Sequence, residues 1–596
     1  MAGHFFFVVG PSGAGKDSLI SGVRPLLDPK AFVFARRVIT RTAMADAEDH
    51  DSCSEVEFLQ REKDGQFLIT WQAHGLRYGL PASLRDALAR GVHVIANGSR
   101  QMVQALRSEV PSLRVIEVTA PIPVLRARLQ ARQRESAHDI DERLRRANLP
   151  LPDDVACQRV MNDLSLDIGV SRLKAALLHD LEQTPQPQRW LFEKIVGQPL
   201  SRDAYAELLP AIIQGRLASH DVQAFLVACT QNLSENEVIA IAQARTLLYP
   251  RIAWHKPMVV DKHSLGGIPG SRVTMVVVPI VAAHGLLIPK TSSRAITSAA
   301  GTADAMEVLA RVDLDFDEVQ RCVQRTNACI AWNGKLNHSV LDDAMNAMVK
   351  PLGLDSRSWS VASILSKKFT AGATHVVIDI PYAEQGKVKT RQEAVELAGL
   401  FERVGQAMGL VVKAFATDGN APIGQGIGPA LEARDVLRVL DNHPDAPTDL
   451  LNKALFFASQ ILALDPEVGH PEQGERVAKA LLASGAARQS FQDIVAAQGA
   501  MTDLDVSVHQ REVHAPTAGV VRKIHGHVIS NLARTAGAPK IQLAGIDLKK
   551  RVGDAVTQGE LLYVIQSTDR ASVDIAHQHA CQQHGFEITA HAGAAA

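Results

Sequence analysis

Apolar and polar positions along the chain follow two spacings in turn, one typical of strands and one typical of helices. A β-prone apolar run at 5–9 ends at a glycine, and helical spacing follows over 18–23. Strand-like and helix-like runs then alternate, which predicts an α/β domain with a parallel sheet over 1–180. A polar stretch rich in proline and glutamine predicts a linker over 181–189.

The remainder of the chain predicts three more domains. Residues 190–255 have helical spacing without a strand signal, which predicts a helical domain that includes part of 340–370. Strands and helices alternate again over 256–500, and short β-prone runs with many glycines predict a small domain over 501–575. Residues 576–596, rich in histidine, glutamine and alanine, are expected to be disordered. The predicted fold class is multidomain α/β with a small C-terminal α+β or β-rich domain.

Composition and charge narrow the class of protein. The 596 residues are 46% hydrophobic, and 63 Lys and Arg nearly balance 64 Asp and Glu, which excludes a disordered chain and a basic binder of nucleic acid polymers. Six cysteines without a CxxC pair indicate reduced thiols, as in a cytoplasmic protein. The apolar stretch 276–288 contains Pro279 and is too short to span a bilayer, so no membrane partner is expected.

A glycine-rich loop between the first strand and helix carries the first candidate chemistry. The residues from Gly10 to Lys16 match the pattern GxxxxGK, in which backbone N–H groups surround a polyphosphate and the lysine reaches its outer phosphates. The expected nucleotide-binding residues are Gly10, Pro11, Ser12, Gly13, Ala14, Gly15, Lys16 and Asp17. Asp17 stands where a Ser or Thr normally holds Mg²⁺; a carboxylate can also bind this ion, so Asp17 is the candidate metal ligand.

The first 180 residues resemble the guanylate-kinase fold family. The loop, the segments Val-Ile-Thr-Arg at 38–41 and Tyr-Gly at 78–79, and the arginine-rich run 125–134 follow in the family's order. The resemblance implies a P-loop kinase domain that binds ATP, with Lys16 catalytic and arginines that close as a lid over the transferred phosphoryl group. The residues implied for the acceptor and the lid are Arg41, Tyr78, Arg128, Arg132 and Arg134.

Two departures from that family point to the acceptor. Guanylate kinases read guanine with two carboxylates, and the matching positions here hold Thr70 and Gly98. The sequences Lys-Asp-Ser at 16–18 and Asn-Gly-Ser-Arg at 97–100 are instead similar to ribose 1,5-bisphosphate phosphokinases. That resemblance implies an acceptor without a base, ribose 1,5-bisphosphate, which ATP converts to 5-phosphoribosyl 1-diphosphate.

A second group of candidate anion-binding residues follows a strand-like run. Residues 262–267, Lys-His-Ser-Leu-Gly-Gly, combine a cation, a hydroxyl and flexible backbone. About thirty residues further on, 290–302 contain a lysine, an arginine and several serines and threonines. Two such clusters can converge on one oxyanion, although ordinary polar loops have the same composition.

These clusters stand in a stretch over about 190–570 that resembles the thymidine phosphorylase family, and most closely its AMP phosphorylase branch. The motifs that carry the resemblance are KHSLGG, IPKTSSRAITSAAGTADAMEVL, VASILSKK, GATHVVIDIP, IGQGIGPALEARDVL, AGAPKIQLAGIDL and VGDAVTQGELL. The AMP phosphorylase branch cleaves nucleoside 5′-monophosphates with inorganic phosphate, which yields a free base and ribose 1,5-bisphosphate.

The same resemblance implies roles for individual residues. Asp355 matches the proton donor to the leaving base, with His263 as the alternative acid. Lys350 stands where the branch has an arginine, so the charge is kept but a bidentate contact is lost. The nucleotide-binding positions are Gly267, Ser293, Arg294, Ala295, Ile296, Thr297, Ser298, Thr302, Ser363 and Lys387. The phosphate-binding positions are Lys262, Ser264, Ser292 and Thr302.

The product implied for the second half of the chain is the substrate implied for the first half. We therefore hypothesise a bifunctional enzyme that turns a nucleoside 5′-monophosphate, inorganic phosphate and ATP into free base and 5-phosphoribosyl 1-diphosphate, with Mg²⁺ as cofactor. Two alternatives stay open: a thymidine or pyrimidine nucleoside phosphorylase fused to a kinase, and a regulatory protein with one dead site. Because members of the phosphorylase family are dimers or larger, a homo-oligomer is expected.

Overall fold

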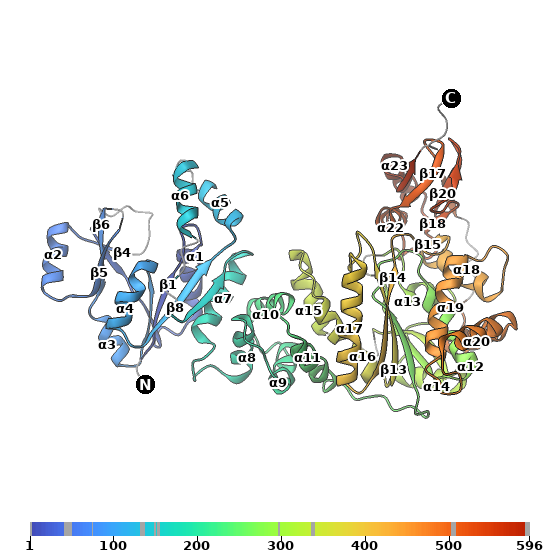
Figure 1. Cartoon of the computed structure of the whole chain (residues 1–596), viewed down its shortest axis with the longest axis horizontal. Coiled ribbons are helices and arrows are strands. Elements are labelled where there is room, and N and C mark those ends of the chain that lie inside the picture. Colours follow the sequence, from blue (N-terminus) through green and yellow to red (C-terminus); the bar gives the residue numbers. More distant parts are fainter. Residues whose placement is uncertain are drawn as a thin grey trace. The chain divides into compact units, whose positions relative to one another are not determined.

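The computed structural model describes residues 3–40, 50–73, 75–131, 137–147, 151, 155–295, 298–334, 340–501 and 508–589. The chain forms two compact units: the first comprises Met1–Ala240 and Leu341–Ser356, and the second comprises Ile241–Val340 and Arg357–Ala596 (Figure 1). Both units contain parallel sheets with helices, and the second also has antiparallel sheets near its C-terminal end. The predicted multidomain α/β class is therefore confirmed.

The first unit begins with a parallel sheet in the order β2-β7-β1-β8-β9. Its strands are β1 (Phe5–Val9), β2 (Phe32–Phe34), β7 (His93–Asn97), β8 (Leu113–Thr119) and β9 (Cys157–Met161). All residues of the central strand β1 are buried, as expected for the middle of a parallel sheet. The carboxyl end of β1 leads into the glycine-rich loop and then into α1 (Lys16–Val23).

A second sheet of this unit has the order β4-β3-β6-β5. Its strands are β3 (Arg37–Ile39), β4 (His50–Ser52), β5 (Phe67–Ala73) and β6 (Leu76–Pro81). The helices around the two sheets are α2 (Glu55–Lys63), α3 (Leu84–Ala89), α4 (Val103–Glu109), α5 (Ile122–Ala131) and α6 (Ala137–Ala147). β5 and β6 pair antiparallel, which places Trp71 opposite Tyr78.

Helix α7 (Leu166–Leu178) is buried on every face, since each residue from Ile168 to Leu177 is enclosed. One side of α7 packs in the core of the parallel sheet, and the other meets α8 (Gln186–Ile195) and α10 (Ser219–Gln231) (Figure 1). There the Lys174 ammonium lies 2.7 Å from the Asp221 carboxylate, and the two side chains are only 9% and 2% exposed. The sheet and the helices that follow it in sequence therefore share one core.

The linker predicted over 181–189 is wrong, because α8 begins at Gln186 and packs against α7. Pro185 caps α8 and a second proline stands in its first turn, where proline is tolerated, so the proline-rich composition marks the start of a helix. The helical part of the unit comprises α8, α9 (Arg202–Ile213), α10 and α11 (Glu235–Thr246), with the segment 341–356 that contains most of α15 (Val340–Met348).

The second unit is built on parallel strands at its centre. β10 (Val260–Ser264), β13 (His375–Tyr382) and β14 (Val411–Asp418) form one sheet, and β11 (Ile288–Ser292) pairs with β12 (Ala328–Trp332). β13 and β14 lie between α16 and α17 on one side and α12 and α19 on the other (Figure 1). The helices of this part are α12 (Val273–His284), α13 (Thr302–Glu307), α14 (Phe316–Thr326), α16 (Arg357–Thr370), α17 (Arg391–Ala407), α18 (Pro429–Leu440), α19 (Thr448–Leu462), α20 (Pro471–Ala483) and α21 (Ala486–Gln498).

The apolar stretch around 276–288 is largely the helix α12, whose residues from Val273 to Ala282 are buried among those neighbouring helices and strands. Its apolar character on all faces is typical of a helix inside a protein core. Across the part of the chain that the structure describes, no helix combines the length and the apolar character that crossing a bilayer requires.

The C-terminal part of the second unit has two antiparallel sheets, in the orders β15-β18-β20-β16 and β19-β17-β21. Their strands are β15 (Gly426–Ile427), β16 (His509–His514), β17 (Gly519–Ile524), β18 (Gly545–Leu548), β19 (Ala555–Val556), β20 (Leu561–Ser567) and β21 (Phe586–Thr589). Two helices, α22 (Gly526–Thr535) and α23 (Arg570–Gln582), complete this part.

The prediction of a disordered tail over 576–596 is wrong for the residues up to Thr589. Helix α23 continues to Gln582, and β21 pairs with β17. The helix is held by Val573, Ala576 and Ala580, which are buried at helical spacing, while Gln578 and His579 are exposed. The high content of histidine, glutamine and alanine led to the prediction of disorder, and the spacing of these apolar residues was overlooked. Residues 590–596 lie outside the described residues.

We expect the protein with the intact ion pair between α7 and α10 to be much more stable than a variant that keeps only one of the two buried charges. Asp221→Ala leaves the Lys174 ammonium buried without its partner and should lower the free energy of unfolding by about 3–5 kcal/mol. Glu109→Ala is the matched control, because it breaks the Arg85–Glu109 pair, whose side chains are about half exposed, and should cost less than about 1 kcal/mol. Urea denaturation measures both; equal losses would contradict a shared core at α7.

Candidate active sites

The loop between β1 and α1 has the backbone of an anion-binding site. Gly15 has a φ of +87°, and a Cβ on this residue would lie 2.5 Å from the amide nitrogen of Asn162, so glycine is required here. The same amide donates a hydrogen bond of 2.8 Å to the carbonyl of Ala14 and holds the loop from behind. α1 begins directly after Gly15, so the N–H groups of its first turn, which have no acceptor within the helix, point towards the loop.

The cation and the carboxylate of this loop are both held in place. The Lys16 ammonium donates hydrogen bonds to the carbonyls of Gly10 and Pro11, at 2.9 and 3.1 Å. The Asp17 carboxylate accepts a hydrogen bond of 2.5 Å from the amide of Asn97, at the end of β7. A carboxylate is a hard oxygen ligand and this bond fixes its orientation, so the residues present fit a Mg²⁺ ion beside bound phosphates.

Arginines from α5 and α6 reach the same loop. Arg128 Nη1 is buried, has no hydrogen-bond partner among the described residues, and lies 4.0 Å from the place that a Cβ of Gly15 would take. Arg143 donates a hydrogen bond of 3.1 Å to the hydroxyl of Ser12. The structure thus brings the predicted Arg128 to the loop and adds Arg143, which the sequence did not indicate.

Packing accounts for one of the two departures from guanylate kinases. A Cβ at Gly98 would lie 2.2 Å from the ring of Phe7, so an aspartate cannot be placed there without moving a buried side chain of β1. At the other position, the Thr70 hydroxyl donates a hydrogen bond to the carboxylate of Glu62.

The predicted acceptor residue Tyr78 stacks on Trp71 of the neighbouring strand, with ring centroids 5.3 Å apart and planes at 10°. This stacking fixes the ring on the second sheet of the first unit. The predicted site residues that lie outside the described residues are Arg41, Arg132, Arg134, Ile296 and Thr297.

The second candidate site lies at the carboxyl ends of β10 and β13, the edge at which open α/β sheets bind ligands. Lys262 and Ser264 alternate along β10 and share a face, where the ammonium donates a hydrogen bond to the hydroxyl. Ser264 in turn donates a hydrogen bond of 2.8 Å to Asp379 of β13. Burial of Lys262 lowers its pKa to about 8, although the nearby Asp379 carboxylate opposes the shift.

Asp379 is shared by several donors from different elements. Its carboxylate accepts a hydrogen bond of 2.6 Å from Thr417 of β14 and lies 3.3 Å from the Lys453 ammonium of α19. The Lys262 ammonium is further away, at 3.9 Å, and rests 4.9 Å from the ring centroid of Phe457, one turn after Lys453 on α19. Lys453 and Asp379 were not predicted from the sequence.

The opposite face of β10 carries a second group of charges. The Asp261 carboxylate lies 2.7 Å from Lys368 of α16 and 3.7 Å from Lys290 of β11. Burial and the neighbouring Lys368 lower the pKa of Lys290 to about 7. Burial and these lysines also hold the pKa of His263 well below its usual value, so this imidazole is neutral near pH 7. A neutral imidazole argues against the alternative in which His263 is the acid.

The loop after β11 is anchored by one carboxylate of α13. Asp304 accepts hydrogen bonds from the backbone N–H groups of Ala295 and Gly301, at 2.7 and 2.8 Å. Arg294 lies 3.3 Å from the same carboxylate and donates a hydrogen bond of 2.7 Å to Glu307. The predicted nucleotide-binding residues Arg294 and Ala295 are therefore held against the first turn of α13.

Thr302, predicted to hold phosphate, is positioned by a buried arginine. Arg272 donates hydrogen bonds to the Thr302 hydroxyl and to the Ala300 carbonyl, at 3.3 and 3.2 Å. Its guanidinium lies 2.5 Å from Glu432 of α18. Burial raises the pKa of Glu432 to about 7, although Arg272 opposes the shift.

The other predicted residues of the second unit occupy different surroundings. Ser363 of α16 accepts a hydrogen bond of 3.3 Å from Arg245, and Ser292 is buried at the end of β11. Gly267 and Lys387 are exposed in loops. Ser293 is exposed, and the Ser298 hydroxyl donates a hydrogen bond of 2.9 Å to the carbonyl of Ala300.

The predicted proton donor Asp355 belongs to the first unit, as does Lys350. The residue after it, Ser356, donates a hydrogen bond of 3.3 Å to the Cys229 carbonyl of α10. Gln223 of α10 likewise donates a hydrogen bond of 2.9 Å to the Met348 carbonyl. The segment that carries Asp355 is therefore held on α10.

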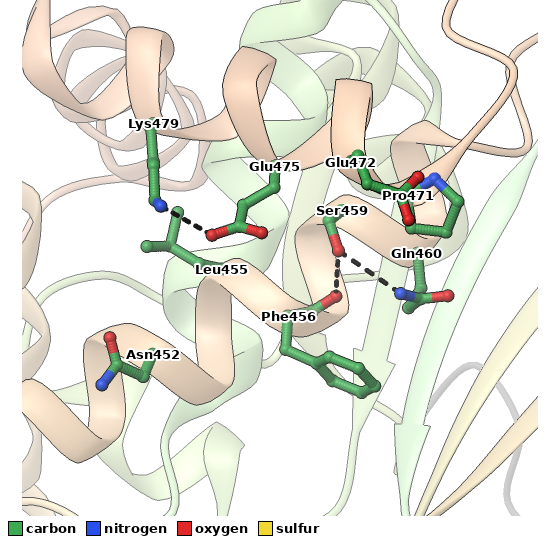
Figure 2. Close-up of a pocket in the computed structure, with 9 residues that line it drawn as sticks. All are labelled: Asn452, Leu455, Phe456, Ser459, Gln460, Pro471, Glu472, Glu475 and Lys479. Carbon is green, nitrogen blue, oxygen red and sulfur yellow. Dashed lines mark hydrogen bonds and ion pairs between the residues drawn. The ribbon is translucent and has the colours of Figure 1, made fainter.

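A pocket of about 300 Å³ opens between α19 and α20 and is separate from these sites (Figure 2). Figure 2 shows Glu475 and Lys479 pointing towards each other, and their charged groups are 2.6 Å apart. Lys453 and Phe457, the residues of α19 that reach Asp379 and Lys262, are not among those that line the pocket.

Comparison with known proteins gives one family model and several close relatives. The model of the "Glycosyl transferase family, a/b domain" matches residues 256–488. The chain is 55% identical over 577 residues to a bifunctional ribose 1,5-bisphosphokinase-thymidine phosphorylase of Cupriavidus pinatubonensis, covering 96% of each protein. It is 48% identical over 675 residues to the protein of the same name from Azorhizobium caulinodans, covering 98% of this chain and 97% of the relative.

Another relative matches over part of the chain. A putative thymidine phosphorylase of Rhodopseudomonas palustris is 45% identical over 399 residues, which are 67% of this chain and 77% of the relative. Among solved structures, anthranilate phosphoribosyltransferase from Thermus thermophilus matches with a TM-score of 0.43 and 17% identity, covering 52% of this chain and 99% of that structure.

The lowered pKa of Lys262 predicts how anion binding at β10 depends on pH. An ammonium is charged below its pKa, so affinity for inorganic phosphate should fall as the pH rises through about 8. A bound oxyanion favours the charged form, so binding near this pH should take up protons. Calorimetry in two buffers with different ionisation enthalpies measures this uptake. Lys262→Met is the control, and equal proton uptake by this variant would contradict the assignment.

Proposed function

Because this chain belongs to the family of bifunctional ribose 1,5-bisphosphokinase–thymidine phosphorylases, we propose that its two activities act in succession on one pentose. In the first reaction, inorganic phosphate cleaves a nucleoside 5′-monophosphate to a free base and ribose 1,5-bisphosphate. In the second, ATP phosphorylates the 1-phosphate group of this sugar, giving 5-phosphoribosyl 1-diphosphate and ADP. The more specific part of this proposal is the substrate, which is a nucleoside 5′-monophosphate rather than thymidine.

The observation that carries this choice is the acceptor side of the kinase, where Phe7 leaves room only for glycine at position 98. An acceptor without a base fits a site that lacks this base-reading carboxylate. Phosphorolysis of thymidine would release deoxyribose 1-phosphate, which lacks the 5-phosphate that a bisphosphokinase requires. Phosphorolysis of a nucleoside 5′-monophosphate supplies a sugar with phosphate at both ends.

For the kinase step, the N–H groups of the loop and the start of α1 would bind the phosphates of ATP, and Lys16 would leave its two carbonyl partners for the outer phosphates. Arg128 and Arg143 would neutralise charge on the transferred phosphoryl group from the lid side. Asp17, held by Asn97, would bind Mg²⁺, which neutralises phosphate charge when it is present.

For the phosphorolysis step, the lysines beside β10 and β11 would attract inorganic phosphate, and Ser264 and Thr302 would orient it towards the anomeric carbon. The bond from this carbon to the base breaks through an oxocarbenium-like state as the phosphate oxygen bonds to it. We assign Asp355 as the group that protonates the departing base. The homo-oligomer expected for the phosphorylase family remains part of this proposal.

Substrate choice is tested by product analysis of the purified protein. We expect AMP, CMP or UMP with inorganic phosphate and MgATP to yield free base and 5-phosphoribosyl 1-diphosphate, followed by liquid chromatography and mass spectrometry. Thymidine is the matched comparison. Rapid phosphorolysis of thymidine with none of any nucleoside monophosphate would contradict the monophosphate proposal and favour a thymidine phosphorylase joined to a kinase.

The two sites are tested for independence with Lys16→Ala. Removal of the ammonium that serves the outer phosphates should reduce kinase turnover by about a hundredfold or more, because phosphoryl transfer depends on positioned charge. Phosphorolysis should stay within about twofold of the unchanged protein, since Lys16 lies in the other unit from β10. Loss of both activities in a folded variant would contradict independent sites.

A further inference from the structure

One buried carboxylate at the second site faces two ammonium groups. Asp379 lies 3.3 Å from Lys453 and 3.9 Å from Lys262, and the side chains of Asp379 and Lys262 are each 1% exposed. The two lysines approach from different elements, Lys453 from α19 and Lys262 from β10. Opposite charges in such a dry environment attract strongly. If one lysine neutralises Asp379, the ammonium of the other lysine is available to bind a ligand.

Lys453 is the lysine that is closer to the carboxylate. Its ammonium also donates a hydrogen bond of 3.1 Å to Thr417, and Thr417 donates one of 2.6 Å to Asp379. Lys453, Thr417 and Asp379 thus form a closed triangle that joins α19 to β14 and β13. Lys262 remains outside this triangle, bonded to Ser264.

We propose that Lys453 is a positioning residue of the phosphorolytic site: as the counter-ion of Asp379, it keeps Lys262 off this carboxylate and available to inorganic phosphate. The inference rests on the phosphorolysis proposed above. Without Lys453, the Lys262 ammonium has an unneutralised carboxylate within reach and should move onto it. An ammonium paired with a carboxylate attracts an incoming phosphate dianion far less than one that is free.

The charges around Lys262 agree with this role. Burial lowers its pKa to about 8, Asp379 and Asp261 raise the pKa, and Lys453 and Arg272 lower it. Loss of Lys453 removes one of the positive charges that lower the pKa of Lys262. It also leaves Lys262 as the lysine that pairs with Asp379. Both changes move the pKa of Lys262 upwards.

The test compares Lys453→Met with Lys453→Arg in steady-state phosphorolysis. The KM for phosphate of Lys453→Met should rise about tenfold or more, with kcat at saturating phosphate within about threefold of the unchanged protein. The pH at which this KM begins to rise should also move upwards, because Lys262 holds its proton longer beside Asp379. Lys453→Arg keeps the counter-ion and should restore most of the affinity.

A second variant separates this role from simple packing. In Asp379→Asn/Lys453→Met the carboxylate that would capture Lys262 is gone, so the KM for phosphate should return to within about threefold of the unchanged protein. Lys479→Met on the neighbouring helix α20 is the control, because it makes the same substitution at an exposed lysine that lies away from Asp379. It should change neither KM for phosphate nor kcat.

Three results would overturn the proposal. These are an unchanged KM and pH profile in Lys453→Met, a fall in kcat without a change in KM, and a double variant that binds phosphate no better than Lys453→Met. Absence of phosphorolysis in the unchanged protein would instead overturn the proposed function together with this inference, so the two failures are distinguishable.

Discussion

The second candidate site depends on an excess of buried positive charge at the carboxyl ends of parallel strands. Four lysines, Lys262, Lys290, Lys368 and Lys453, gather around two carboxylates, Asp261 and Asp379. Burying an ammonium is costly unless it is paired, and the lowered pKa values of Lys262 and Lys290 show that this cost is not fully offset. A bound oxyanion would balance this charge, which supports the proposed binding of inorganic phosphate beside these lysines. The division of the two carboxylates between the two faces of β10 keeps the lysines from collapsing onto one partner.

The loop between β1 and α1 is suited to attract phosphate groups by a different physical route. Its positive field comes from backbone N–H groups and the first turn of α1, and the Lys16 ammonium donates hydrogen bonds to the carbonyls of Gly10 and Pro11. Such a lysine can leave weak neutral partners when a nucleotide arrives, which suits a substrate that must enter and leave. The second site instead places its lysines beside buried carboxylates, which suits the small and rigid phosphate ion.

The sequence was informative wherever chemistry and local structure coincide in one short segment. The loop from Gly10 to Lys16 and the pair Lys262 and Ser264 were predicted because each stands at the end of an apolar strand. Asp379 and Lys453 were missed, since these residues are far apart in the chain and meet only after folding. A charged residue just before the end of an apolar strand was the one available signal for Asp379. The order of α23 was missed because composition was weighed above the spacing of Val573, Ala576 and Ala580.

The buried helix α7 shows that the kinase sheet and the helical part are not independent domains joined only by a linker. α7 contributes to the core of the kinase sheet and also meets α10, where Lys174 pairs with Asp221. α10 in turn holds the segment 341–356 through hydrogen bonds to its backbone and from Ser356. Asp355, the residue assigned to protonate the base, is therefore mounted on the same compact unit as the phosphate loop. A movement of the helical part that carries Asp355 must also carry α7, which packs against α1. The kinase sheet and the helical part are therefore joined through a shared core as well as through the peptide chain.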